Sequence, residues 1–200
     1  KICKKHHIAV IGDEIQTFGR TPKLFAFQYF NCQKEVDIIT IGKLSQVCAT
    51  LFNKNYKPQP GLISQTFTSS TAAIHASKII IKKLTETNNY GKNGRIQDIH
   101  HQFTEGLKMI EKNNPHLLKG PYGIGSMIAF TPLDGAVKSV GLLMDILYEE
   151  GIIGFIAGKS PARIRFLLPF LHLQDSDIPN CLKIIENSLI KTHQKLKEIS

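Results

Sequence analysis

The chain has 200 residues, of which 42% are hydrophobic and 20% are charged. This composition is typical of a globular protein and excludes a disordered or fibrous one. A chain of this length buries roughly two-thirds of its unfolded surface, so it needs no disulfide or metal to stabilise a core. Lys and Arg number 25 against 16 Asp and Glu, and the formal net charge is +9.

The four cysteines form no CxxC pair, and no Cys/His cluster has the spacing of zinc ligands. We therefore expect reduced thiols, no metal site and a cytoplasmic location. Lys, His, Gly or Pro interrupts every apolar run well before the roughly 18 to 20 residues that a membrane-spanning helix needs. The sequence predicts a soluble protein with no membrane partner.

The lysines are spread over several separate segments. A nucleic-acid surface gathers its positive charge on one face, with aromatic residues between the basic ones. Only residues 54–57 (KNYK) have that pattern. We therefore interpret the charge as solvated lysine, and a basic nucleic-acid-binding domain is a distant third hypothesis.

The first half of the chain predicts alternating strands and helices. His7–Ile11 and Val36–Ile41 are short apolar runs typical of buried parallel strands, and the segment between them is long enough for a crossover. Gln46–Phe52 predicts a third strand. Thr71–Leu84 has helical composition, with Ser69 and Ser70 as candidate caps. The expected fold class is α/β, with a mostly parallel sheet and flanking helices.

The turn cluster Tyr90–Arg95 is the best candidate boundary, so we expect one domain at 1–89 and a second at 90–200. Beyond it, an amphipathic helix is predicted from five apolar residues at helical spacing: Ile96, Ile99, Phe103, Leu107 and Ile110.

The remaining elements of the second half alternate between strands and helices. We expect a strand at Ile124–Phe130, then a helix with Val137, Val140, Met144 and Leu147 on one face, which ends at Gly151. Two short strand-like runs at Ile152–Ala157 and Ala162–Leu168 precede a closing amphipathic helix. This half is expected to be a small α+β domain.

Polar side chains follow the first two expected strands. Asp13 and Glu14 come after the first, and Gly42 and Lys43 come after the second. The carboxyl ends of parallel strands meet at one edge of a sheet, where ligands bind, so a carboxylate and a lysine are expected at the mouth of one crevice. The alternative is a surface salt bridge between two loops.

Two segments resemble the class III family of pyridoxal-phosphate aminotransferases. They are VIGDEIQTFGRTPKLFAFQYF at Val10–Phe30 and VDIITIGK at Val36–Lys43. Members of that family carry a strand ending in Asp-Glu-x-Gln-Thr, a Gly-Arg-Thr-Gly turn and a second strand ending in Gly-Lys. The resemblance continues along essentially the whole chain. It implies that 1–89 is the C-terminal part of the large coenzyme-binding domain and that 90–200 is the small C-terminal domain.

The resemblance implies roles for three residues of the first half. Asp13 would be buried and would keep the pyridine nitrogen of pyridoxal 5'-phosphate protonated, which makes the ring an electron sink. Lys43 would hold the coenzyme covalently and then act as the base that moves a proton. A lysine suits this role because its pKa falls readily on burial. Gln16 would bond the phenolic oxygen of the coenzyme.

Two further residues match family positions. Thr66 would bind the coenzyme phosphate of the neighbouring subunit, and Arg165 would bind the substrate α-carboxylate through its planar fork. Arg163, two residues earlier on the expected strand, is the competing arginine. Arg20 could be structural. Cys48, in apolar surroundings, is expected to be a buried and unreactive thiol.

The run Gly-Lys-x-x-Gln-Val-Cys is most similar to lysine 6-aminotransferase. We therefore expect amino-group transfer from a diamino or ω-amino acid (lysine, ornithine or 4-aminobutyrate type) to a 2-oxo acid such as 2-oxoglutarate, in a homodimer with shared active sites. Family members also have an N-terminal half that supplies phosphate and ring contacts, so the chain resembles an N-terminally truncated fragment. The alternative is a non-catalytic remnant, or a subunit that needs a separate N-terminal half.

Overall fold

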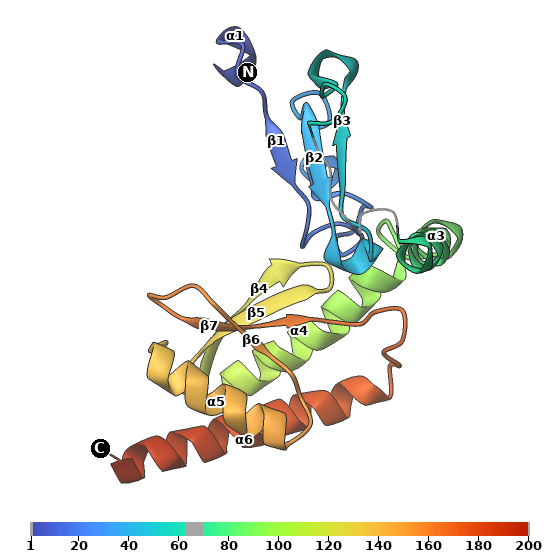
Figure 1. Cartoon of the computed structure of the whole chain (residues 1–200). Coiled ribbons are helices and arrows are strands. Elements are labelled where there is room, and N and C mark those ends of the chain that lie inside the picture. The colour runs from blue at the N-terminus through green and yellow to red at the C-terminus, as the bar shows by residue number, and fades with distance from the viewer. Residues whose placement is uncertain (1, 63–69, 200) are drawn as a thin grey trace. The chain divides into compact units, whose positions relative to one another are not determined.

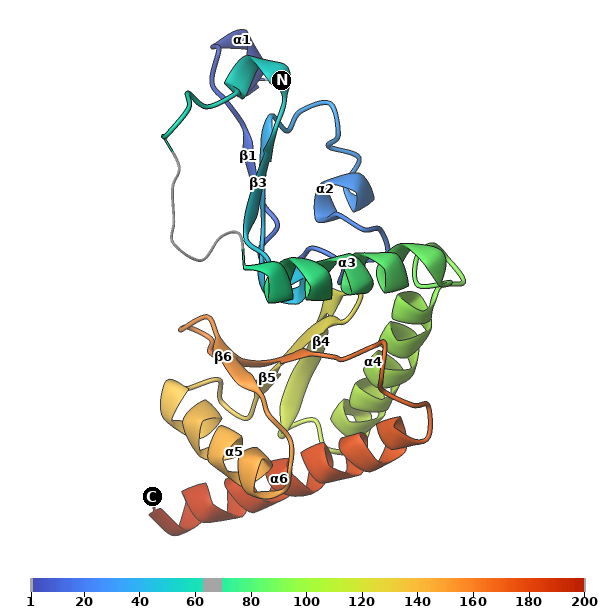
Figure 2. The same ribbon diagram turned by 45° about the vertical axis from the view of Figure 1, so that its right-hand side comes forward.

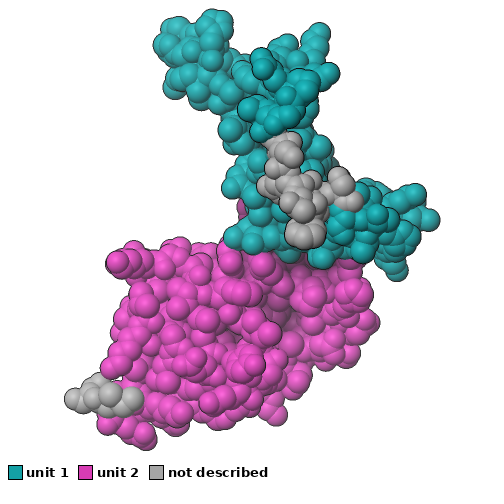
Figure 3. All heavy atoms as spheres, viewed as in Figure 1, with its two compact units in different colours: residues 1–94 teal, residues 95–200 magenta. Residues whose placement is uncertain are grey.

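The computed structural model describes residues 2–62 and 70–199. Two compact units make up the chain, Lys1–Gly94 and Arg95–Ser200, coloured separately in Figure 3. The division falls inside the Tyr90–Arg95 turn cluster. None of the helices in the described part of the chain is long and apolar enough to cross a bilayer.

The first unit contains a three-stranded sheet of order β1-β2-β3 (Figure 1). Strand β1 pairs with β2 in parallel, and β3 pairs with β2 antiparallel. The elements are α1 (Ile2–Lys5), β1 (Ile11–Asp13), α2 (Ala26–Tyr29), β2 (Ile38–Ile41), the 3-10 turn η1 (Lys43–Ser45), β3 (Ala49–Phe52), the 3-10 turn η2 (Lys54–Tyr56) and α3 (Thr71–Glu86).

The first strand lies later than the sequence predicts. It begins at Ile11, the last residue of the expected run, and pairs with β2 over Ile11–Asp13. His7, the first residue of that run, takes a left-handed conformation (φ +55°) that a strand cannot contain. Ile11 is 62% exposed, so the expectation of a buried strand is wrong for β1. Among the described strands only β2 pairs with β1, which leaves its other edge open.

Helix α3 forms where predicted, but its start is not capped as expected. Ser70 is the N-cap residue and its side chain makes no capping hydrogen bond. The other end is held by Asn89, which is buried and donates from Nδ2 to the carbonyl oxygens of Lys83 and Leu84 at 3.0 and 3.2 Å. These bonds satisfy carbonyls that a helix end leaves without partners.

The second unit packs three helices on one face of an antiparallel sheet of order β4-β5-β7-β6 (Figures 1 and 2). The elements are α4 (Arg95–Asn113), β4 (Leu118–Ile124), β5 (Met127–Pro132), α5 (Val137–Glu149), β6 (Phe155–Ala157), β7 (Arg163–Leu167) and α6 (Asp177–Ile199).

The core of this unit confirms the helical spacing of α4, since all five predicted residues are buried. Helix α5 ends at Glu149, just before Gly151 with φ +88°, as expected. Val140 and Leu147 are buried as predicted, whereas Val137 is 47% exposed. Leu143 and Ile146, which were not predicted, are also buried. The expected strand 124–130 is confirmed in part: Met127–Phe130 lie in β5, but a turn at Gly125 (φ +61°) leaves Ile124 at the end of β4.

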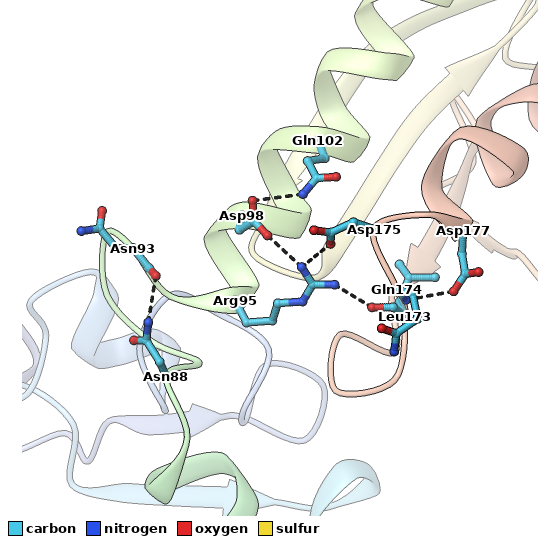
Figure 4. Close-up of polar contacts among 9 residues, drawn as sticks. All are labelled: Asn88, Asn93, Arg95, Asp98, Gln102, Leu173, Gln174, Asp175 and Asp177. Atoms are coloured by element: carbon cyan, nitrogen blue, oxygen red, sulfur yellow. Dashed lines mark hydrogen bonds and ion pairs between the residues drawn. The ribbon is translucent and has the colours of Figure 1, made fainter.

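The start of α4 is tied to the segment before α6 by Arg95 (Figure 4). Its guanidinium donates to the carboxylates of Asp98, at 2.8 Å, and Asp175, and to the carbonyl oxygen of Leu173 at 2.6 Å. One arginine thereby joins residues about eighty positions apart, and the planar fork makes such multiple contacts possible.

Candidate coenzyme and substrate site

The parallel register places Asp13 and Lys43 at the same edge of the first sheet. Asp13 lies opposite Thr40, and the backbone N–H of Glu14 donates to the Thr40 carbonyl oxygen at 2.9 Å. Lys43 follows Thr40 by three positions, two residues after β2 ends at Ile41. The carboxylate and the amine that the strand pattern predicts at one edge are therefore brought there by the fold.

Asp13 is held by one of its two carboxylate oxygens. Oδ1 accepts hydrogen bonds from the Ile15 N–H at 3.1 Å and from the Thr40 hydroxyl at 3.3 Å, while Oδ2 has no partner among the described residues. The residue is exposed, so the burial that the resemblance implied is not present in this chain. Asp13 also makes no ion pair with Lys43 within the described structure, which argues against the surface salt bridge.

Lys43 sits on a locally strained turn. Its φ is +55° and that of Gln46 is +59°, both in the left-handed region that non-glycine residues rarely adopt. Such conformations cost on the order of 1–3 kcal/mol each and persist only where neighbours enforce them. Gln46 donates to the Lys43 carbonyl oxygen from both its backbone and its amide, and buried Ser45 donates to the Val47 carbonyl oxygen at 2.7 Å.

The Gly-Arg-Thr turn packs against Leu44, the residue after Lys43. Gly19 has φ +74°, and a Cβ placed there would lie 2.7 Å from Cδ2 of Leu44 and 3.1 Å from Cδ1 of Leu84. A Cβ at this position would require Leu44 to move, so glycine lets the turn approach the residue next to Lys43. The contact links the loop after β1 to the loop after β2 and to helix α3.

Glu14 is a structural residue that the sequence analysis did not recognise. Its side chain is buried and accepts hydrogen bonds from the backbone N–H groups of Ala26, at 3.0 Å, and Phe27, at 2.9 Å, and from the Thr17 hydroxyl. It closes the loop after β1 onto the start of α2. The one sequence signal is a threonine three positions later, which is too common to identify this role.

The structure gives a different outcome for each of the other residues singled out in the first half. Arg20 donates from Nη1 to the carbonyl oxygen of Gln16 at 2.8 Å, so it has the structural role that the sequence left open, and it fixes the backbone of half-buried Gln16. Thr66 lies outside the described residues. Cys48 is exposed, so the expectation of a buried thiol is wrong. It lies outside the strand, just before β3 begins at Ala49, and β3 is an edge strand of this sheet.

Arg165 lies in the second unit, on strand β7. It is half-buried, and its guanidinium carbon is 5.9 Å from the ring centre of Phe155 on β6. Arg163 is on the same face of β7, with its guanidinium carbon 4.8 Å from the ring centre of Tyr122 on β4. The sheet therefore presents both competing arginines, and each lies against an aromatic ring.

The donor set of the first unit is chemically suited to an aldehyde coenzyme with a pyridine nitrogen. An exposed primary amine can bond covalently to an aldehyde, and a carboxylate with one oxygen available can accept a hydrogen bond from a protonated ring nitrogen. Asp13 ends strand β1 and Lys43 begins the 3-10 turn η1, and hydrogen bonds hold both segments in place.

A family model described as Aminotransferase class-III matches residues 1–189. The chain belongs to the class III aminotransferase family. The resemblance seen in the sequence is confirmed, and the coenzyme of this family is pyridoxal 5'-phosphate. The fold is the mixed α/β fold of these enzymes.

Two curated relatives of this class III chain illustrate the match. Acetylornithine aminotransferase of Prochlorococcus marinus is 26% identical over 184 residues, which cover 90% of this chain and 42% of the relative. 5-aminovalerate aminotransferase of Pseudomonas putida is 28% identical over 200 residues, which cover 92% of this chain and 45% of the relative. The chain therefore spans less than half the length of these relatives.

Solved structures agree on the fold. Lysine aminotransferase from M. tuberculosis superposes with a TM-score of 0.78 at 20% identity, covering 96% of this chain and 43% of that one. An ornithine aminotransferase from Plasmodium yoelii gives a TM-score of 0.74 at 24% identity, with 96% and 51% covered.

Proposed function

We propose that the chain supplies the C-terminal part of a pyridoxal-phosphate-dependent transaminase. The reaction would move an amino group from a diamino or ω-amino acid to a 2-oxo acid such as 2-oxoglutarate. The observation that carries the proposal is the placement of Asp13 and Lys43 at one sheet edge, with Lys43 on a turn strained by two left-handed residues.

Each residue has a role that its chemistry supports. When bound, the coenzyme supplies an electron sink for the negative charge that develops on the substrate carbon. Asp13 would accept a hydrogen bond from the ring nitrogen, and the Lys43 amine would hold the coenzyme and carry the proton between the reacting carbons. Gln16 would bind the phenolic oxygen, and Arg165 would hold the α-carboxylate of the amino acid.

The choice of amino donor rests on the relatives and on one motif. Their names refer to acetylornithine, 5-aminovalerate, ornithine and lysine, all of which carry an amino group away from the α-carbon. The Gly-Lys-x-x-Gln-Val-Cys run favours lysine among these. A panel of lysine, ornithine, 5-aminovalerate and 4-aminobutyrate, each paired with 2-oxoglutarate, measures the preference.

Coenzyme attachment tests the proposal directly. The chain mixed with pyridoxal phosphate should develop a visible absorption band, and borohydride reduction followed by mass spectrometry should find the coenzyme on Lys43. Lys43→Ala should abolish both signals. Lys54→Ala is the matched control, because Lys54 is an exposed lysine that begins the other 3-10 turn of the same unit. An equal loss of the absorption band in both variants, or attachment of the coenzyme to a different residue, overturns the assignment of Lys43.

A second candidate is that the chain acts only together with further polypeptide, or is a non-catalytic remnant. It is favoured by the exposed apolar side chains of the first sheet: Ile11, Leu51 and Phe52 are 62%, 44% and 43% exposed. Adding the N-terminal half of a class III relative as a separate polypeptide distinguishes the two. Transaminase activity that appears only in the mixture indicates a split enzyme. No activity in the chain alone or in the mixture indicates a remnant.

The homodimer is also a proposal. Helix α3 exposes Ile74 and Ile81, which are seven positions apart and therefore on one face, at 47% and 37%, a surface that association of two copies would cover. Sedimentation of the wild-type chain and of Ile74→Glu tests it. A dimer that dissociates in the variant supports the proposal, and a wild-type monomer at high concentration contradicts it.

A further inference from the structure

Lysines that lie far apart in the sequence meet at one end of the first unit. Strands β1 and β2 are parallel and both begin at this end, and the antiparallel strand β3 ends there. Residues 2–10, 31–37 and 53–57 therefore flank the sheet at this end, whereas Asp13 and Lys43 lie at the opposite edge. The two views in Figures 1 and 2 agree that α1 and the teal turn after β3 lie at the same end of the sheet.

Asp37 joins the three segments. Its carboxylate accepts hydrogen bonds from the backbone N–H of Val10 at 3.0 Å and from the side-chain amide of Asn53 at 3.1 Å. Its backbone N–H donates to the Val10 carbonyl oxygen at 2.9 Å, and its carbonyl oxygen accepts from the Asn53 N–H at 3.1 Å. Neighbouring strands lie about 4.8 Å apart, so the three segments meet the sheet within about 10 Å of one another.

We call this region the basic end, and we define it by its exposed lysines: Lys4, Lys5, Lys34, Lys54 and Lys57. The three segments carry two acidic residues, Glu35 and Asp37. Glu35 lies 3.9 Å from Lys4, and Asp37 is bonded to neutral groups. Within the described part of the chain, no ion pair involves the other four lysines. The folded unit thus gathers positive charge that is spread out along the sequence.

Tyr56 places an aromatic ring between two lysines of the basic end. It lies in the 3-10 turn η2, between Lys54 and Lys57, and is 36% exposed. Asn53 fixes this turn, because its side chain accepts from the Asn55 N–H and its carbonyl oxygen from the Tyr56 N–H, both at 3.0 Å. Proteins that bind single-stranded nucleic acid combine cations along the backbone with aromatic rings on which bases stack. The basic end has both components.

We propose that the basic end binds single-stranded nucleic acid, with its lysines on the phosphates and Tyr56 stacked on a base. A single strand fits better than a duplex, because its bases are unpaired and accessible to the ring. An anionic lipid surface is the competing partner, since Ile2 and Ile8 at the same end are 77% and 55% exposed. Lipid is disfavoured because α1 has four residues, too few for an amphipathic helix that lies in a membrane surface.

Salt-dependent binding to the full chain without coenzyme tests the contribution of the lysines. A labelled oligo(dT) of about 15 nucleotides should bind with a fluorescence anisotropy change. The slope of log Kd against log NaCl concentration should be about 2 to 3.5, as expected for three to five lysine–phosphate contacts on a single strand. Replacing both Lys54→Gln and Lys57→Gln should lower this slope by about 1.4. Lys78→Gln with Lys82→Gln is the matched control, a pair of exposed lysines on α3 that should leave the slope unchanged.

Tyr56→Ala tests the stacking contact separately from the charge. It should weaken oligonucleotide binding about fivefold or more and keep the wild-type salt slope, because it removes a ring and no cation. Tyr148→Ala, at a side chain on α5 that is 72% exposed, is the control and should bind as the wild type does. Inorganic polyphosphate gives a readout on the unaltered chain. It should bind more weakly than the oligonucleotide, since it carries charge but no bases.

Four results would overturn the proposal: no binding of the oligonucleotide, an unchanged salt slope in the double lysine variant, wild-type affinity in Tyr56→Ala, or tighter binding to phosphatidylserine vesicles than to the oligonucleotide. The proposed function is tested independently, because these titrations contain no coenzyme. Coenzyme attachment to Lys43 should be unchanged in the Lys54 and Lys57 double variant, since the basic end lies at the opposite end of the sheet.

Discussion

Glu14 and Ala26, twelve residues apart, are joined by a hydrogen bond of 3.0 Å from the Ala26 backbone N–H to the Glu14 carboxylate. The second carboxylate oxygen accepts from Phe27 in the same way. One buried side chain thus satisfies two N–H groups at the start of α2. Because Asp13 is the adjacent residue, this contact also fixes the backbone next to the carboxylate that we propose binds the ring nitrogen of the coenzyme.

Glu14→Gln should lower the free energy of unfolding of the first unit by about 1–3 kcal/mol, since an amide offers one acceptor oxygen where two N–H groups need acceptors. Urea denaturation measures the change. Glu35→Gln is the control, because Glu35 is 40% exposed and lies 3.9 Å from Lys4 in a surface pair that contributes little. Equal losses in the two variants would contradict the anchoring role.

Gly19→Ala should impair the site as well as the fold. A left-handed alanine costs about 1–2 kcal/mol, and its Cβ would in addition displace Leu44, next to Lys43. Gly61→Ala is the matched control, because Gly61 has φ +81° and nothing within 4 Å of a Cβ. We expect both variants to lose stability, but only the Gly19 variant to lose coenzyme attachment at Lys43. Attachment that is unaffected in both would show that the packing does not position Lys43.

Sequence patterns over a few neighbouring residues predicted those parts of the fold that depend on interactions between such residues. The spacing of apolar residues gave α4 together with its buried face, and the rule for parallel strands placed Asp13 and Lys43 at one edge. The division of residues 124–130 was missed, because only Gly125 and Ser126 separate Ile124 from the apolar residues that begin at Met127, and two small residues also occur inside strands.

Features that depend on distant neighbours could not be read from the sequence. The partners of Glu14 lie more than ten residues away, and the exposure of Cys48 follows from its position beside an edge strand. The aromatic contacts of Arg163 and Arg165 depend on the order of strands in the sheet, which puts β4 and β6 on opposite sides of β7.

Tyr90→Phe should stabilise the first unit. The hydroxyl of Tyr90 is buried and has no hydrogen-bond partner in the described structure, and burial raises the pKa of this phenol far above its usual value. Removing a buried polar group without a partner should raise the free energy of unfolding by about 1 kcal/mol. Thermal or urea denaturation measures it, with Tyr29→Phe, at a side chain that is 41% exposed, as the control. A loss of stability in Tyr90→Phe would show that the hydroxyl has a partner.

The stability of the second unit should fall as the pH drops through the histidine range, with His193 on α6 contributing. Partial burial lowers the pKa of His193, and the charges of Lys197 and His116 lower it further. Asp134 lines the same cavity of about 350 Å³, and the pKa of its own carboxyl is lowered by hydrogen bonds from Ala136 and Ser139.

The direction follows from proton binding. Below the ordinary histidine pKa of about 6.5, the unfolded chain binds a proton that folded His193 does not yet accept. The free energy of unfolding therefore decreases as the pH falls, and it levels off once the pH is below the pKa of folded His193. Denaturation between pH 7.5 and pH 5 should therefore show a loss of stability that is smaller in His193→Gln. His172→Gln, at an exposed position of the same unit, is the control and should keep the wild-type slope. A His193 variant with the wild-type slope would assign the pH dependence to other groups.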